Sequence, residues 1–165
     1  SQFLLNTLYI GYSIGIAPII GFNYGSGNAA RQKRVFSISM RFIAAASAVI
    51  FAASMLGGSR IVGLFAEETS AVCQIAANGF TIFSFSFLFC GLNIFTSTMF
   101  TALSNGKVSA VLSFLRTFGL LAGGILLLPR FWGITGVWLA VPAAEGIMFI
   151  ISSACLIYYR KRYSY

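Results

Sequence analysis

The stretch Thr69–Gly106 reads TSAVCQIAANGFTIFSFSFLFCGLNIFTSTMFTALSNG and contains 38 residues without a Lys, Arg, Asp or Glu. As one helix it would be about 57 Å long, whereas a hydrocarbon core is about 30 Å thick, so it has to tilt, bend or leave some turns among the headgroups. Lipid offers polar groups no hydrogen-bond partner. We therefore expect this to be the functional helix, with its polar residues facing protein or water; they include Asn78, Ser84, Ser86, Asn93, Thr96, Ser97, Thr98 and Thr101.

The composition of the whole chain predicts an all-α membrane protein. Apolar residues make up 58% and charged residues 8% of the sequence, against about 25% charged residues in soluble domains. The net charge of +8 lies in short clusters between apolar runs and not along one helix face. Such clusters are typical of loops that set membrane topology, so we expect the lipid bilayer, and no nucleic acid, as a partner.

The sequence lacks the residues that several common kinds of catalytic and metal-binding site require. The chain has no His and no Asp, and its carboxylates are Glu67, Glu68 and Glu145. This argues against Ser-His-Asp and Cys-His catalysis and against the common zinc sites. The three cysteines are widely spaced within apolar runs, which favours neither a disulfide framework nor a metal site. We expect no enzyme, no catalytic residue, no bound metal and no cofactor beyond a coupling ion.

The apolar runs predict five transmembrane helices in one antiparallel bundle that forms a single domain over residues 1–165. The spans cover about residues 3–22, 35–58, 69–103, 108–128 and 134–159. Turns are expected at Asn23–Arg34, Ser59–Glu68, Ser104–Lys107 and Pro129–Gly133, with Glu67 and Glu68 preceding the third helix. Gly57–Gly58 is expected to end the second span.

The loop charges predict the orientation. One side carries Arg31, Lys33, Arg34, Lys107, Arg160, Lys161 and Arg162, whereas the other carries Arg60 and Arg130. An excess of Lys and Arg marks cytoplasmic loops, which places the C-terminus in the cytoplasm. The first span then begins outside, and the chain starts with Ser1, so we expect a fragment that lacks its N-terminal part.

Glu145 is the only carboxylate within a predicted span. An acid inside the membrane indicates a proton or cation site. The alternatives are a structural acid paired with Arg116 or Arg130, or one that reaches the outer interface. Asn93 similarly either binds a cation or substrate or bonds neighbouring helices. Arg116 is interpreted as a structural partner, and Pro18 and Pro142 as kinks or gating hinges.

The many phenylalanines of the long run leave two interpretations open. Phe89 and its neighbours could line a cavity for hydrophobic cations through cation–π attraction. Packing and lipid-facing rings are the commoner arrangement, and we assign only a minority of the rings to a cavity.

Three stretches together resemble the multidrug and toxin extrusion (MATE) transporters. They are PIIGFNYGSGN at Pro18–Asn28, FTALSNGK at Phe100–Lys107 followed by Arg116, and LP at Leu128–Pro129 followed by GITGVWLAVPAAE at Gly133–Glu145. The resemblance extends over nearly the whole chain. It implies the C-terminal part of a twelve-helix transporter of the multidrug/oligosaccharidyl-lipid/polysaccharide flippase superfamily, in which a missing N-terminal lobe faces this one across a central cavity.

The resemblance also implies an activity. Such transporters are secondary active antiporters of the cell membrane that export small organic, often cationic, compounds in exchange for Na⁺ or H⁺ by alternating access. We expect a multi-pass protein of the bacterial plasma (inner) membrane. We expect Asn93, Phe89, Thr96 and Glu145 to bind substrate or cation.

This chain departs from the family pattern at three positions. The long helix lacks the carboxylate that many members carry, and Asn93 is the nearest replacement. Phe89, one turn earlier, lacks the family's aromatic hydroxyl, and Thr101 replaces a Gln. The coupling acid could then lie in the missing lobe. A lipid-linked polysaccharide flippase of the same superfamily and a non-transporting scaffold subunit remain alternatives.

Overall fold

The computed structural model describes residues 2–63 and 71–165, together with the side chains of residues 6–57 and 75–165. The described chain consists of helices and short turns, without a strand, which confirms the prediction of an all-α membrane protein. The elements are α1 (Gln2–Gly25), α2 (Ala29–Gly63), α3 (Ala71–Ser84), α4 (Phe87–Ala102), α5 (Gly106–Phe114), the π-helical segment η1 (Leu115–Ala122) and α6 (Gly123–Tyr163).

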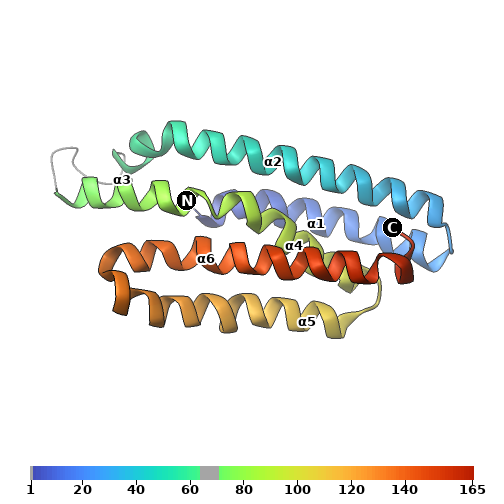
Figure 1. The fold of residues 1–165 in the computed structure, drawn as a ribbon. Helices are drawn as coiled ribbons and strands as arrows, with labels where there is room; N and C mark the ends of the chain where they lie inside the picture. The colour runs from blue at the N-terminus through green and yellow to red at the C-terminus, as the bar shows by residue number, and fades with distance from the viewer. Residues whose placement is uncertain (1, 64–70) are drawn as a thin grey trace.

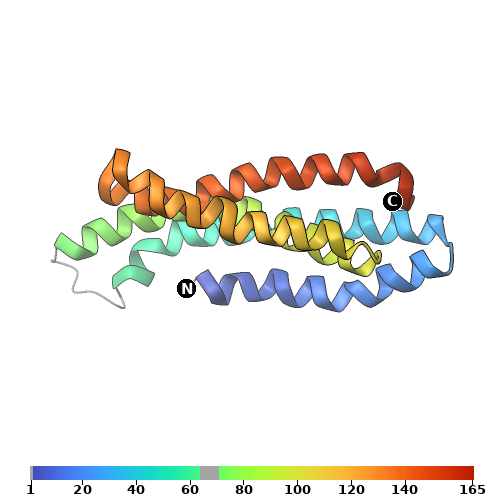
Figure 2. The same cartoon turned by 90° about the horizontal axis from the view of Figure 1, so that it is seen from below.

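The helices form an elongated bundle in which α4 is central (Figures 1 and 2). It packs against α1, α2, α5 and α6, while α6 also packs against α3 and η1. Its side chains supply much of the core, since Phe95, Met99 and Phe100 are at most 1% exposed. The second half of the long uncharged run, α4, therefore lies at the centre of the bundle.

One end of the bundle collects the basic residues, and we call it the basic end. The α1–α2 turn, the α4–α5 turn and the C-terminus all lie there, at the right of Figure 1. Asn105 of the α4–α5 turn donates a hydrogen bond through Nδ2 to the hydroxyl of Tyr163 at 2.9 Å, which joins that turn to the C-terminal segment. The loop clusters predicted to share one side of the membrane thus lie at one end of the bundle.

The long run bends between α3 and α4, which meet at 47°. The backbone tightens there, since the amides of Phe85 and Ser86 donate to the carbonyls three residues earlier. The hydroxyl of Ser84 donates to the Phe80 carbonyl at 2.8 Å, a contact that often bends helices. Of the three outcomes expected for so long a helix, bending is the one that occurs.

Two predicted connections differ from the structure. The expected loop at Asn23–Arg34 is mostly helical, because α1 continues to Gly25 and α2 begins at Ala29. Asn28 makes this short turn possible, since its Oδ1 accepts the Arg31 amide at 3.0 Å and caps the new helix. Gly57–Gly58 does not end the second helix, which runs on to Gly63. The predicted helix start at Glu67 and Glu68 lies outside the described residues.

The α5–η1–α6 part folds back on itself at Gly133, within the predicted turn Pro129–Gly133. Gly133 has φ 53° and ψ −132°, which only glycine adopts readily. Close packing follows at Gly136, where an added Cβ would overlap the Leu128 carbonyl oxygen and lie 2.8 Å from the Pro129 nitrogen. Glycine at this position lets the two antiparallel arms of the hairpin meet.

Two stretches of the described chain, Ala29–Gly57 and Gly106–Tyr163, are long and apolar enough to cross a membrane. The bent pair Ile75–Ser84 and Phe87–Ala102 gives a third if it is counted as one span. Gly106–Tyr163 includes the reversal at Gly133 and so contains both the fourth and the fifth predicted spans. α1 coincides with the first predicted span but is not among these stretches. The division into five spans stays a prediction.

Candidate functional site

Asn93 of α4 and Glu145 of α6 meet in the interior of the bundle. The Asn93 Nδ2 donates to Glu145 Oε2 at 2.7 Å and to the backbone carbonyl of Glu145 at 3.0 Å. Both residues are buried, at 2% and 6% exposure. The structure therefore brings together the two polar residues that the sequence singles out, although 52 positions separate them.

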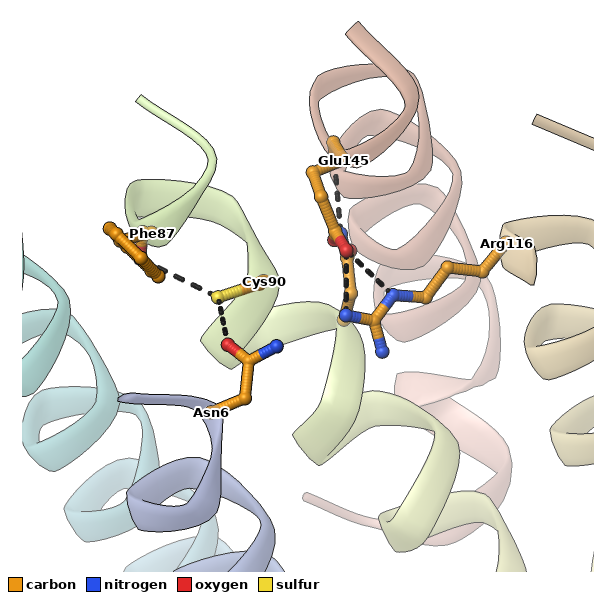
Figure 3. Close-up of polar contacts among 6 residues, drawn as sticks. Asn6, Phe87, Cys90, Arg116 and Glu145 are labelled. Atoms are coloured by element: carbon orange, nitrogen blue, oxygen red, sulfur yellow. Dashed lines mark hydrogen bonds and ion pairs between the residues drawn. The ribbon is translucent and has the colours of Figure 1, made fainter. Parts of the chain in front are cut away.

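Arg116 of η1 completes the group. Its Nε and Nη2 donate to Glu145 Oε1 at 2.9 and 2.6 Å, and Figure 3 shows the two side chains pointing toward one another. Of the arrangements left open for Glu145, the structure shows pairing with Arg116. We call Asn93, Arg116 and Glu145 the carboxylate cluster.

The carboxylate cluster lies well inside the helices that carry it. Counted along α6 from Gly133, Glu145 is about 18 Å from the turn, and Arg116 is about 15 Å from the start of α5. The Arg116 side chain is 24% exposed and that of Glu145 is 8% exposed. Ionised groups at such depth face protein or a water-filled space, and the partial exposure of Arg116 places it at the edge of the bundle.

One polar atom of the cluster has no partner. The Oδ1 of Asn93 is buried and accepts no hydrogen bond from the described residues. Leaving a buried acceptor unpaired costs about 1–3 kcal/mol, and such atoms in proteins are commonly satisfied by water or an ion. Together with the two carboxylate oxygens it gives the cluster the oxygen donors that a hard cation prefers.

The π-helical segment η1 places Arg116 and was not predicted. π-Helical turns are rare and occur frequently at functional sites. Glycines accompany this one: at Gly119 an added Cβ would lie 2.8 Å from Leu115 Cδ1, and at Gly124 one would lie 3.4 Å from the Ala140 carbonyl oxygen. The glycine-rich sequence Gly119–Gly124 was the available signal, because glycine has a low helix propensity and lets helices approach closely.

The other two predicted binding residues lie beside the cluster without joining it. Thr96 is fully buried, but its hydroxyl donates to the Leu92 carbonyl of its own helix at 2.7 Å. The Phe89 ring packs on Phe149 of α6 with ring centroids 5.3 Å apart. Their assignment to a substrate or cation site stays a prediction.

Pro18 and Pro142 both lie inside helices. Pro142 is buried in α6, one turn before Glu145, whereas Pro18 is exposed in α1 toward the basic end. Pro142 therefore weakens the backbone of α6 beside the carboxylate, because a proline supplies no amide hydrogen to the helix. A gating role for either proline stays a prediction.

A second group of polar contacts ties α1 to α4 near the cluster (Figure 3). The Cys90 thiol donates to Asn6 Oδ1 at 3.4 Å. The Tyr9 hydroxyl lies 3.2 Å from both the Ser47 hydroxyl and the Phe87 carbonyl. An added Cβ at Gly91 would lie 2.7 Å from the Tyr9 ring. These contacts fix α1 against α4 at the level of the cluster.

An apolar groove of about 490 Å³ lies between α2, α4 and α6. Leu88 and Leu92 line it from α4, and Phe149 and Ser153 line it from α6. Most of the phenylalanines in the long run pack elsewhere, for example in the pairs Phe83–Phe87 and Phe51–Phe85. The groove therefore takes its aromatic side chains from outside that run.

Comparison with known proteins identifies the family. A family model described as MatE matches residues 2–123, which include Asn93 and Arg116. No curated protein and no solved structure matches the chain. Because the match spans more than half of the sequence, the chain belongs to the MatE family of membrane transporters, within the superfamily that also contains flippases.

Proposed function

We propose that this chain is part of a secondary active multidrug efflux antiporter, which exports organic, often cationic, compounds in exchange for Na⁺ or H⁺ by alternating access. The observation that carries the proposal is the carboxylate cluster, a buried Glu145 held between Arg116 and Asn93 in the middle of a MatE-family bundle. A buried intramembrane carboxylate marks a site for a proton or a cation, which such exchange needs.

The apolar groove supports an organic substrate. Its volume of about 490 Å³ falls in the range of pockets that hold drug-sized ligands. Phe149, which lines the groove, lies one helical turn beyond Glu145 on the same side of α6. An amphipathic cation could therefore place its apolar part in the groove and its charge toward the carboxylate.

The charges of the helices favour this activity over lipid-linked polysaccharide flipping. A flippase needs intramembrane Arg or Lys for phosphate groups. Among the described residues, Arg116 is engaged by Glu145, and Arg41 is exposed on α2, twelve residues from the start of that helix. A cluster centred on a carboxylate suits a cation better than a phosphate.

We further propose that the basic end faces the cytoplasm of a bacterium, in line with the positive-inside rule. It carries the C-terminal Arg160, Lys161 and Arg162. In this arrangement the chain works with a second lobe, and the two rock about a shared cavity, as in other transporters built from repeats.

The proposal is tested by ethidium accumulation in cells that express the full-length protein. We expect less ethidium in these cells than in empty-vector cells, with the difference removed by an ionophore that collapses the Na⁺ or H⁺ gradient. Accumulation equal to that of empty-vector cells while both gradients are intact would contradict the proposal.

Filling the apolar groove is expected to reduce ethidium efflux severalfold. Ala48 lines the groove from α2, so Ala48→Trp places an indole in the space assigned to the substrate. Val49 is the next residue, is 67% exposed and does not line the groove, so Val49→Trp is a matched control. The prediction is checked by the initial efflux rates of the two variants at equal expression. Equal rates would show that the substrate does not pass through the groove.

A further inference from the structure

A row of hydroxyl side chains connects α4 to α5, and we call it the hydroxyl seam; its members are Ser97, Thr101, Ser109 and Ser113. Thr101 Oγ1 lies 2.7 Å from Ser109 Oγ. Ser97 Oγ lies 3.1 Å from Ser109 Oγ and 2.7 Å from Ser113 Oγ. The four hydroxyls therefore form one connected series of hydrogen bonds between the two helices.

Other hydroxyls of the same long run behave differently. Thr81, Ser84 and Thr98 each donate to the carbonyl four residues earlier in their own helix. That arrangement satisfies a hydroxyl within a single helix, so it needs neither water nor another helix. In the hydroxyl seam Thr101 also donates to the Ser97 carbonyl at 3.2 Å, and Ser97 donates to the Ser109 carbonyl at 3.3 Å. In addition, the seam hydroxyls lie within hydrogen-bond distance of one another across the two helices.

The inner end of the hydroxyl seam lies one helical turn from the carboxylate cluster along each of its two helices. On α4, Asn93 precedes Ser97 by four residues, and on the α5–η1 helix Arg116 follows Ser113 by three. Residues at these spacings share a helix face. The buried Asn93 Oδ1, which accepts no hydrogen bond from the described residues, thus belongs to the same face of α4 as the seam. Its missing donor indicates a water molecule or a cation at this end.

The outer end of the hydroxyl seam opens at the basic end of the bundle. Of its two members there, Thr101 is exposed and Ser109 is 8% exposed, whereas at the inner end Ser97 is half-buried and Ser113 is exposed along the side of the bundle. Thr101 is next to the last residue of α4, directly before the α4–α5 turn. The seam therefore runs from the membrane surface to the level of the partly exposed Arg116, without a charged residue in between.

We propose that the hydroxyl seam is a hydrated path by which the coupling cation passes between the basic end and Glu145. Hydroxyl and carboxylate oxygens are suitable ligands for a hard monovalent cation such as Na⁺, and hydrogen-bonded hydroxyls and waters also relay protons. The inference rests on the proposed function for the identity of the cation. The path itself is testable without any transport measurement.

The test is the reactivity of single cysteines in the full-length protein, after Cys73, Cys90 and Cys155 have been replaced by Ala. Ser97→Cys and Ser113→Cys place a thiol in the seam at little change in volume. Val111→Cys and Phe114→Cys are matched controls on α5, because both residues are more than 60% exposed and lie outside the seam. The probe is a permanently cationic, membrane-impermeant methanethiosulfonate applied to inverted and right-side-out membrane vesicles.

We expect the seam cysteines to react at least roughly tenfold faster than the two controls, and from the side of the basic end, because a charged reagent is excluded from hydrocarbon. Equal rates at seam and control positions, or reaction only from the opposite side, would overturn the inference. If the seam cysteines react but ethidium is not exported, the proposed function fails while the hydrated path stands.

A second measurement tests whether the seam hydroxyls serve as a path for the cation or only hold α4 to α5. In the otherwise native protein, the double variant Ser97→Ala/Ser113→Ala is expected to slow gradient-driven ethidium efflux severalfold while ethidium binding and the melting temperature stay unchanged. A lowered melting temperature with an unchanged efflux rate would show that the hydroxyls only hold α4 to α5, and would overturn the inference.

Discussion

Replacement of Glu145 by Gln is expected to reduce gradient-driven ethidium efflux roughly tenfold or more, because the carboxylate cluster then carries a net positive charge. Two unit charges about 4 Å apart interact by about 4 kcal/mol at an effective dielectric constant near 20. The substitution removes that attraction for a cation and leaves the Arg116 guanidinium, which now repels it. Initial efflux rates at equal expression, with Glu145→Asp as the charge-preserving comparison, measure the effect.

An exchange of the two charges distinguishes a structural ion pair from a functional one. Removing one partner of a buried pair costs about 3–5 kcal/mol, so Glu145→Gln and Arg116→Gln should each lower the melting temperature in detergent. The double variant Glu145→Arg/Arg116→Glu restores a pair and should recover much of the melting temperature. It moves the negative charge away from Asn93, however, and is expected not to recover efflux. Full recovery of efflux would mean that the pair only holds η1 to α6.

Replacement of Gly136 by Val is expected to lower the stability of the α5–α6 hairpin. An added Cβ would overlap the Leu128 carbonyl and lie 2.8 Å from the Pro129 nitrogen, both of which are backbone atoms that cannot rotate away. The two arms of the hairpin would have to separate, at a cost of about 1–3 kcal/mol or more. Thermal unfolding of the purified full-length protein, followed by circular dichroism, measures the change.

Gly15→Ala is the control for this substitution. Gly15 lies inside α1, and an added Cβ there would meet no atom within 4 Å. The replacement should leave stability unchanged or raise it by about 0.5–1 kcal/mol, because alanine favours the helix. Equal melting temperatures for Gly136→Val and the unaltered protein would show that the α5–α6 hairpin does not pack as closely as described.

The residues of the carboxylate cluster show which parts of the candidate site could be predicted from the sequence. Asn93 and Glu145 could be selected because polar residues are rare within long apolar runs, where they cost free energy unless they are paired or hydrated. The short turn before residue 134 also made the partner Arg116 predictable, since it requires antiparallel neighbours. Thr96 was selected by the same rule, but its hydroxyl bonds to its own helix, an alternative that the pattern does not distinguish from binding.

The hydroxyl seam and η1 could not be predicted from the sequence. An isolated serine such as Ser109 or Ser113 does not by itself indicate a site, and the contacts of both residues depend on the rotation of α5 relative to α4. The four-residue spacing of Asn93, Ser97 and Thr101 was the signal that marked one face of α4. A π-helical segment is rare, and η1 packs against α6, a contact that residue spacing along the chain does not specify.

The sequence by itself determined that the chain is an all-α protein of the lipid bilayer. It also determined that the basic loops lie together at one end of the bundle. These properties follow from composition and from the order of apolar and charged residues, which decide where a chain can leave a bilayer. Only the tertiary structure decided where the long run bends and that Asn93 meets Glu145 and Arg116. Those contacts join residues 29 and 52 positions apart, so they depend on how helices rotate and pack, which local patterns do not specify.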